Sequence, residues 1–394
     1  MATIARETRA ARGHVGSEVG AYLRHLDYLL IAAVGGVIAY GIWVLTAVTR
    51  NDVPGDASYF VSRQQVYIAV GAVLAAVVTA ISPDIYRRYA NGLYALAVAL
   101  LLLVLVVGDD VRGSKRWIEF GSFRFQPSEI GKVLLILFLA AFVANRVRSD
   151  TPWKTVWGAV GLASLPMILV FKEPDFGSTL IYGSALLAVL VFGGVPWKHL
   201  ASLAVVTALI ALSVLWFLPS AGLDVLDTYQ KDRLIGFVHP DVDPSGTTYN
   251  VNQSITAVGA GGLEGRGVTE ASQTRFDYLP EHATDFVFAS FAEQRGFFGA
   301  SILLLLYLLV VWRGLRVVTV AGDLYGAVVA GGIVFAFLFQ VFVKVGMTMG
   351  IAPVTGIPLP FVTVGGSSMV ANLVAVGVLQ AIHARGREAD VLRR

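Results

Sequence analysis

The chain of 394 residues lacks cysteine and is poor in charge. Without a single cysteine, it can have no disulfide, no thiol chemistry and no cysteine-ligated metal. Charged residues make up only 14% of the chain and hydrophobic residues 56%, and the mean hydropathy is +0.70. So little polar surface cannot cover a soluble globule of this length, and the composition therefore indicates a membrane protein.

Short alternating segments typical of a membrane β-barrel are also missing, which leaves helices as the spanning elements. A helix needs roughly 20 mostly apolar residues to cross a bilayer. About ten stretches meet this need, near 26–48, 65–82, 89–108, 129–145, 156–171, 178–194, 199–218, 296–312, 322–343 and 366–383. The predicted fold class is therefore an all-α polytopic membrane protein with about ten transmembrane helices.

The beginning of the chain carries arginines but no apolar core ahead of a small-residue cleavage site, so it does not resemble a signal peptide. We expect a cytoplasmic tail over 1–25, a transmembrane domain over 26–383 and a second cytoplasmic tail over 384–394. The domain includes a large extracytoplasmic loop at about 219–284, between helices 7 and 8. This orientation follows the positive-inside rule. The basic residues that it places inside include Arg87, Arg88, Arg146, Arg148, Lys154, Lys198, Arg313, Arg316, Arg385 and Arg387.

One basic loop breaks that rule. The segment VRGSKRWIEFGSFRFQPSE (111–129) faces outside in this topology, yet it carries Arg112, Lys115, Arg116 and Arg124 among aromatic residues. Two interpretations stay open. The loop is either a re-entrant or interfacial element that meets anions, or it contacts lipid head groups.

The outer loop contains the glycine-rich stretch GAGGLEGRG (259–267). Its spacing matches neither the dinucleotide fingerprint nor the P-loop. The glycines can permit tight turns close to a lipid or glycan, or form a cradle of backbone amides for a diphosphate.

Ionisable residues stand at the edges of several spans. Glu129 and Lys132 are three residues apart and share one helical face, and Ser128 is placed to cap the fourth span. Lys132 either snorkels outward or serves a site. Asp175 lies in the very short connection between the fifth and sixth spans, where it either caps a helix or lines a wet cavity.

The stretch YLPEHATDFVFASFAEQRG (278–296) places three acids, Glu281, Asp285 and Glu293, beside an apolar run. Thr284 and Asp285 are predicted to open the next helix, either as its cap or as part of a site. An acid beside a second acid and several basic loops is typical of a site that moves a proton near an anionic substrate.

Taken together, six motifs resemble those of the SEDS family of shape, elongation, division and sporulation proteins, and the similarity spans nearly the whole chain. They are RWIEFGSFRFQPSEIGK (116–132), EPDFGSTL (173–180), the segment 229–267, YLPEHATDF (278–286), FAEQRGFFG (291–299) and GMTMGIAPVTGIPLPFVTVGGSS (346–368). The pattern HPDVDPSGTTY within 229–267 is more similar to the elongation branch than to the division branch.

The resemblance implies a peptidoglycan glycosyltransferase that polymerises lipid II at the outer face of the cytoplasmic membrane, for cell elongation and rod shape. The family's essential aspartate falls on Asp285, the catalytic base. Its other functional residues, which we assign to substrate binding, fall on Arg116, Glu129, Lys132 and Asp175. We add Glu281 and Glu293 to the substrate-binding residues, and they are also the next candidates for the base. Three positions depart from the family pattern, namely His282, Gln294 and Lys344, which stands where asparagine is common.

The expected chemistry is a single inverting displacement, in which a base removes the proton of the acceptor sugar hydroxyl and a diphosphate leaves. Arg116, Lys132 or a divalent cation, Mg²⁺ or Mn²⁺, would stabilise that diphosphate. The expected partners are lipid II, undecaprenyl-diphosphate-linked glycan, membrane lipids and a class B penicillin-binding protein that acts as transpeptidase, with no nucleic acid. The alternatives are a lipid II flippase or transporter, a scaffold that recruits a synthase, and a division-specific polymerase.

Overall fold

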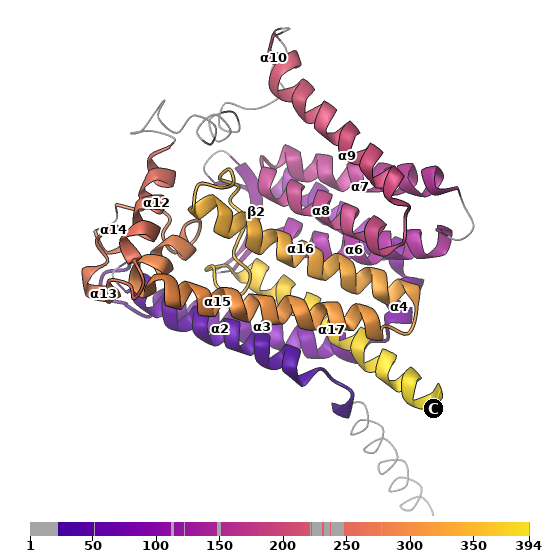
Figure 1. Cartoon of the computed structure of the whole chain (residues 1–394), viewed down its shortest axis with the longest axis horizontal. Coiled ribbons are helices and arrows are strands. Elements are labelled where there is room, and N and C mark those ends of the chain that lie inside the picture. The colour runs from indigo at the N-terminus through magenta and orange to yellow at the C-terminus, as the bar shows by residue number, and fades with distance from the viewer. Residues whose placement is uncertain are drawn as a thin grey trace, which may run out of the picture.

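The computed structural model describes residues 23–50, 52–111, 114–121, 123–147, 151–220, 222, 231, 237, 248–276 and 278–393. Some predicted features lie outside these residues: most of the tail 1–25, Arg112, Arg148 and most of the HPDVDPSGTTY pattern. Figure 1 shows a bundle of long helices, with a group of short helices at one end and the C-terminus near the other. We call these the far end and the terminal end.

Ten apolar helices in the described part of the chain confirm the predicted number of spans. Nine are long and apolar enough to cross a membrane, where α9 is counted together with its helical continuation to Ser220, and the tenth, α8, has 17 residues. They are α2 (Tyr28–Val48), α3 (Tyr59–Ala80), α5 (Ala90–Val107), α6 (Pro127–Arg146), α7 (Pro152–Lys172), α8 (Phe176–Phe192), α9 (Trp197–Leu212), α15 (Val287–Val320), α16 (Leu324–Thr348) and α17 (Gly366–Arg393). A short helix, α4 (Pro83–Arg88), precedes α5, and α17 continues through most of the predicted C-terminal tail.

The helix α6 lies at the centre of the bundle, where it packs against α5, α7, α8, α16 and α17. Membrane helices associate through close packing, because lipid tails are as apolar as the side chains themselves. Glycines on α17 permit such close approaches. A Cβ atom on Gly377 would lie 2.6 Å from the carbonyl oxygen of Ala75 in α3, and one on Gly386 would meet the backbone of Val320 in α15.

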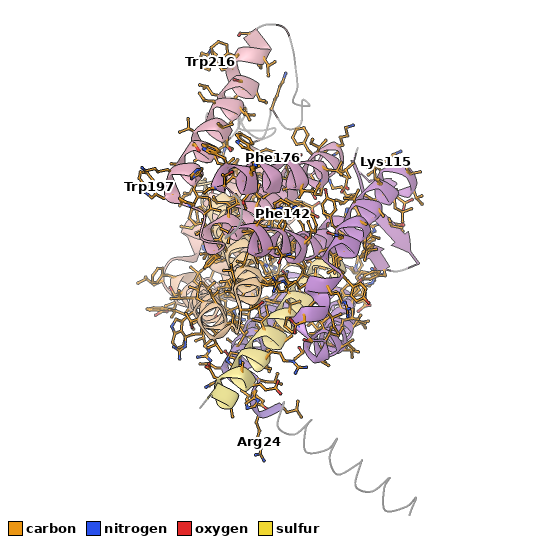
Figure 2. All side chains as sticks on the ribbon, turned by 90° about the vertical axis from the view of Figure 1, so that its right-hand side faces the viewer. Arg24, Lys115, Phe142, Phe176, Trp197 and Trp216 are labelled. Carbon is orange, nitrogen blue, oxygen red and sulfur yellow. The ribbon has the colours of Figure 1, made fainter. Side chains whose placement is uncertain are left out.

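The segment after α8 leans away from this bundle. α9 continues through the π-helical turn η1 (Ser213–Phe217) into α10 (Leu218–Ser220), and none of its residues is buried. Figure 2 shows Trp197 and Trp216 along this projecting segment, and they are 72% and 73% exposed. In a bilayer this segment would contact lipid along its length.

Buried polar contacts join three helices at the terminal end. Asp27 caps α2 by accepting the N–H of Leu30, and its carboxylate also binds the guanidinium of Arg313 on α15, with Nη2 at 2.7 Å. The backbone N–H and carbonyl oxygen of Asp27 bond the side-chain amide of Gln380 on α17. The beginning of α2 and the end of α17 therefore lie on the same side of the bundle.

The basic loop between α5 and α6 forms a small antiparallel sheet, although the sequence led us to expect helices and an interfacial or re-entrant loop. Its strands are β1 (Asp109–Val111), β2 (Ser114–Phe120) and β3 (Phe123–Phe125), in that order. Gly121, with φ +59°, turns the chain between β2 and β3. Glu119 faces Arg124 across the strands and binds it at 2.7 Å. Cross-strand pairs of this kind stabilise short hairpins.

Three short helices cover the far end: α12 (Tyr249–Gly261), α13 (Gly267–Glu270) and α14 (Ser272–Arg275). The glycine-rich stretch after α12 lies against a break in α15 at Gly296, whose φ is +63°. The N–H groups of Phe297 and Phe298 donate to the carbonyl oxygens of Gly262 and Leu263. These glycines therefore permit two backbones to meet, and this contact favours the tight-turn interpretation over a diphosphate cradle.

Candidate active site

Asp285 lies in the turn over 280–286, two residues before α15 begins. Its Oδ1 atom is 3.3 Å from Nζ of Lys344 on α16. The lysine side chain is fully buried, whereas 28% of the aspartate side chain is exposed. A carboxylate held on one side by a buried cation and open on another is suited to accept a proton from a bound substrate.

The interpretation of Thr284 or Asp285 as a helix cap is wrong. Phe286 occupies the N-cap position of α15, and no side chain caps that helix. The hydroxyl of Thr284 instead donates to the carboxylate of Glu281 at 2.6 Å. Glu281 has φ +56°, and this left-handed residue turns the chain back so that the N–H of Phe286 reaches its carbonyl oxygen. The carboxylate of Asp285 therefore has no capping role.

Glu129 and Lys132 form a buried ion pair one turn inside α6, which confirms that they share a helical face. The Nζ–Oε2 distance is 2.7 Å, and the two side chains are only 1% and 6% exposed. Lys132 therefore does not snorkel to the surface. The prediction that Ser128 caps α6 is wrong, because Gln126 holds the cap position and Pro127 is the first helical residue, a position that proline favours.

The connection between α7 and α8 is tied to both β2 and α6. Asp175 caps α8, as one of the two interpretations held, because Oδ1 accepts the N–H of Ser178. Its Oδ2 atom accepts from the amide of Gln126 at 3.0 Å. The guanidinium of Arg116 on β2 donates to the carbonyl oxygens of Glu173 and Pro174. Arg116 and Asp175 thus join the sheet and the start of α6 to the α7–α8 connection.

Glu173 lies in the same connection and is fully buried. Neither of its carboxylate oxygens has a hydrogen-bond partner in the described chain. Burial, assisted by the negative charge of Asp175 and opposed by the positive charge of Arg116, raises the pKa of Glu173 to about 9. The residue therefore keeps its proton at neutral pH and adds no negative charge to the connection.

The carboxylate of Glu293 holds the start of α14 in place. Its carboxylate accepts the N–H groups of Gln273 and Thr274 and the hydroxyl of Thr274, at 2.8 to 3.0 Å. These contacts fix the start of α14, and the glutamate side chain is fully buried. Unlike the partly exposed carboxylate of Asp285, the carboxylate of Glu293 is therefore buried in structural contacts, and that of Glu281 accepts the hydroxyl of Thr284.

The helix α16 connects the two lysine sites. Gln340 and Lys344 are four residues apart and so lie on one face of α16. Gln340 also lines a cavity of about 30 Å³ together with Lys132 and Asn372, among apolar side chains. Oε1 of Gln340 and Nδ2 of Asn372 are buried without partners in the described part of the structure. Gln340 therefore stands between the cavity that Lys132 lines and Lys344, which follows it one turn along α16.

Sequence reasoning missed the roles of Lys344, Gln340 and Asn372. The family pattern marks Lys344 only as a departure, since its partner is 59 residues away in the sequence. The sequence did contain one signal for this site. Gln340 and Lys344 stand one turn apart at the end of an otherwise apolar run, and polar or charged residues inside a span indicate a functional site.

The described residues contain no group of three or more histidine, aspartate or glutamate side chains that could hold a metal ion. The oxygens of Asp175, Glu129 and Glu293 accept hydrogen bonds from protein donors. This part of the chain does not fit a protein-held metal site, so the expected divalent cation stays a prediction.

The fold and site describe a polytopic helical membrane protein with charged groups buried near one end of the bundle. A family model described as "Cell cycle protein", for FtsW, RodA and SpoVE, matches residues 24–388. The chain belongs to this family, which is the SEDS family that the motifs indicated.

Among curated relatives, the peptidoglycan glycosyltransferase MrdB of Escherichia coli (strain K12) is 35% identical over 359 residues, covering 91% of this chain and 94% of that protein. Stage V sporulation protein E of Bacillus subtilis (strain 168) is 33% identical over 355 residues, covering 89% and 93%.

Two solved structures share the fold. One belongs to a peptidoglycan synthase complex, described as coordinating polymerization and crosslinking; it has a TM-score of 0.77 and 28% identity, and the match covers 92% of this chain and 98% of that one. The rod shape determining protein RodA of Thermus thermophilus has a TM-score of 0.67 and 28% identity, covering 91% and 96%.

Proposed function

We propose that this protein is a peptidoglycan glycosyltransferase that polymerises lipid II at the outer face of the cytoplasmic membrane. The similarity to MrdB, a peptidoglycan glycosyltransferase by name, supports the activity. The observation that carries the assignment of the site is the pair of Asp285 and Lys344, an open carboxylate beside a buried cation at the far end of a membrane bundle. The similarity to a rod shape determining protein supports a role in elongation rather than division.

In this proposal Asp285 is the general base. It removes the proton of the 4-hydroxyl group of the acceptor sugar while that oxygen attacks the anomeric carbon of the donor strand. The bond between the anomeric carbon and the polyprenyl diphosphate breaks, and its electrons leave with the diphosphate. One displacement inverts the configuration, so no covalent enzyme intermediate and no second carboxylate are required.

The departing diphosphate gains negative charge, and buried cations are the groups that stabilise it best. Lys132 is buried inside the bundle, where it lines a cavity together with Gln340 of α16, the residue one turn before Lys344. Arg116 uses Nε and Nη2 on backbone carbonyl oxygens, so we assign it the task of holding the sheet against the α7–α8 connection. A divalent cation bound by the diphosphate itself would add to the charge of Lys132.

The proposed orientation places both termini in the cytoplasm. The terminal end carries Arg87, Arg146, Lys198 and Arg385, and a positive inner side is the rule for membrane proteins. The chain has no cysteine, so single cysteines introduced at Lys198 and at an exposed site on α12 can be labelled without background. Labelling of the α12 site alone in intact cells is expected, and labelling of the Lys198 site alone would overturn the orientation.

The proposed partner is a class B penicillin-binding protein anchored by one helix. The similarity to a chain of a peptidoglycan synthase complex supports such an assembly. Apolar side chains on α15 and α16 offer a surface within the membrane, since Leu305, Leu308 and Phe342 are 62%, 61% and 64% exposed. Co-purification of a transpeptidase with this protein, and its loss when Leu308 and Phe342 are both changed to alanine, tests this surface.

Replacement of Asp285 by asparagine tests the assignment of the base. Asparagine keeps the size of the side chain and cannot accept the proton, so polymerisation of lipid II by purified protein should fall about 100- to 10,000-fold. The matched control is Asp390→Asn, which makes the same substitution at an exposed position of α17 and should keep most of the activity. If Asp285→Asn made polymer at more than about a tenth of the parental rate, another group would be the base.

The same preparation distinguishes the proposed polymerase from a flippase. Protein reconstituted in liposomes with lipid II should make polymer, whereas a flippase would exchange lipid II between leaflets without polymer. Restoration of rod shape in cells that lack their own elongation polymerase would separate elongation from division.

A further inference from the structure

The lysine beside the proposed base, Lys344, is the most deeply buried lysine among the described residues. Lys344 has no exposed surface, although an isolated ammonium group in a membrane protein is costly to bury. Its Nζ atom lies 3.3 Å from Oδ1 of Asp285. The energy needed to bury this cation is therefore offset, at least in part, by the carboxylate that we propose as the base.

Packing holds both members of this pair in place. Phe286, the residue after Asp285, is 2% exposed and belongs to a small core that also contains Ala289 and Leu279. Met347, three residues after Lys344 and one turn along α16, is a fully buried member of the same core. The turn and the end of α16 are thus fixed to each other beside the ion pair, so neither partner can move away without opening that core.

The other titratable groups on the elements around this turn have contacts of their own. His282 lies 2.9 Å from Asp52, Glu281 accepts the hydroxyl of Thr284, and Glu293 accepts its three hydrogen bonds from α14. The remaining groups are Tyr249 on α12, Glu270 on α13, Arg275 on α14 and, near the start of α15, Arg295, which lies over the ring of Trp43. Lys344 is the described cation within ion-pair distance of Asp285.

We propose that Lys344 is a positioning residue for the glycosyl transfer. It holds the carboxylate of Asp285 so that its open side meets the acceptor hydroxyl. When Asp285 takes the proton, the net charge of the two side chains changes from zero to +1. That positive charge arises in the same step in which the leaving diphosphate becomes more negative, so Lys344 couples removal of the proton to departure of the diphosphate. This inference rests on the proposed function.

The test compares Lys344→Met and Lys344→Arg with the parental protein, using polymerisation of lipid II measured from acidic to alkaline pH. Methionine keeps most of the volume and removes the charge, whereas arginine keeps the charge. A carboxylate that loses a cation within about 4 to 6 Å holds its proton more tightly, typically by one to three pH units. We therefore expect the acidic limb of the pH–rate profile of Lys344→Met to move to higher pH by about one unit or more. At a pH on that limb, the rate of the variant should then be about tenfold lower than the parental rate for each unit of the shift. The acidic limb of Lys344→Arg should stay near that of the parental protein.

Two results would overturn the role of Lys344. One is a profile for Lys344→Met that coincides with the parental profile. The other is a profile that falls by the same factor at every pH, without recovery in Lys344→Arg, because a purely structural lysine would lower the rate without moving the limb. The rate of each variant is divided by its amount of folded protein, which is determined from the folded yield and from thermal unfolding. Failure of the proposed function is separate, since it appears as absence of polymer from the parental protein or as activity of Asp285→Asn above about a tenth.

Discussion

The ion pair of Glu129 and Lys132 allows stability and catalysis to be measured separately. Both side chains are almost completely buried, with Nζ and Oε2 2.7 Å apart. Lys132→Met removes the cation and leaves Glu129 buried without a partner. Breaking a buried pair by removing one member costs about 3–5 kcal/mol, because an uncompensated charge stays behind. We expect the free energy of unfolding of this variant to fall by that amount, less whatever the glutamate recovers by binding a proton.

The double variant Glu129→Gln, Lys132→Met replaces both charges by neutral groups of similar volume. Such a replacement is often neutral or even stabilising, so the double variant should regain most of the lost stability. It should not regain activity, because the cation that we propose for the diphosphate is absent from both variants. Stability should therefore be lost in Lys132→Met alone, whereas activity should be lost in both Lys132→Met and the double variant.

The assay is a double-mutant cycle on protein purified in detergent, with unfolding followed by circular dichroism and polymer made from lipid II measured on the same samples. The coupling free energy between the two positions should be several times the value of an exposed pair, which is about 0.2–1 kcal/mol. A coupling below about 1 kcal/mol would show that water reaches the pair and would refute the reasoning from burial. A double variant with parental activity would refute the role of Lys132.

Two further predictions concern the backbone and the cation. Gly296→Ala should greatly reduce folded yield, because φ is +63° and a Cβ atom there would run into the backbone of Gly265, whereas Gly161→Ala, which has open space around it, should purify normally. Chelation of divalent cations should lower polymerisation and added Mg²⁺ or Mn²⁺ should restore it, because the diphosphate binds such ions; unchanged activity after chelation would exclude a cation requirement.

Hydropathy predicted the ten spans because length and apolar character alone decide which helices cross a bilayer. The pairing of Glu129 with Lys132 and the cap by Asp175 were also accessible, since both depend on residues three apart in one helix or at its start. Local patterns misplaced the caps at Ser128 and Thr284. In the first case Pro127 starts the helix two residues earlier than expected, and in the second the turn is stabilised by bonds to Glu281 instead.

Contacts between distant parts of the chain were not accessible in this way. The partner of Lys344 lies in a turn before another helix, and spacing along the sequence gives no sign of that proximity. The sheet at 109–125 escaped prediction because two of its strands have three residues, too few to show a periodic pattern. Glu293 looked like a candidate base, since the sequence could not show that the start of α14 folds back onto its carboxylate.

The distribution of polar contacts between the two ends of the bundle bears on the choice between a polymerase and a transporter. A transporter has to open its site alternately to each side of the membrane, commonly through a pair of broken helices in two repeats. At the terminal end, α2, α15 and α17 are held together by the bonds of Asp27 to Arg313 and Gln380. Opening that end would separate a buried carboxylate from its guanidinium partner, a change that is expensive inside a membrane protein. At the far end, by contrast, the carboxylate of Asp285 is already exposed in part. The energetic asymmetry favours a site that works from one side only, as a polymerase of lipid-linked sugars does.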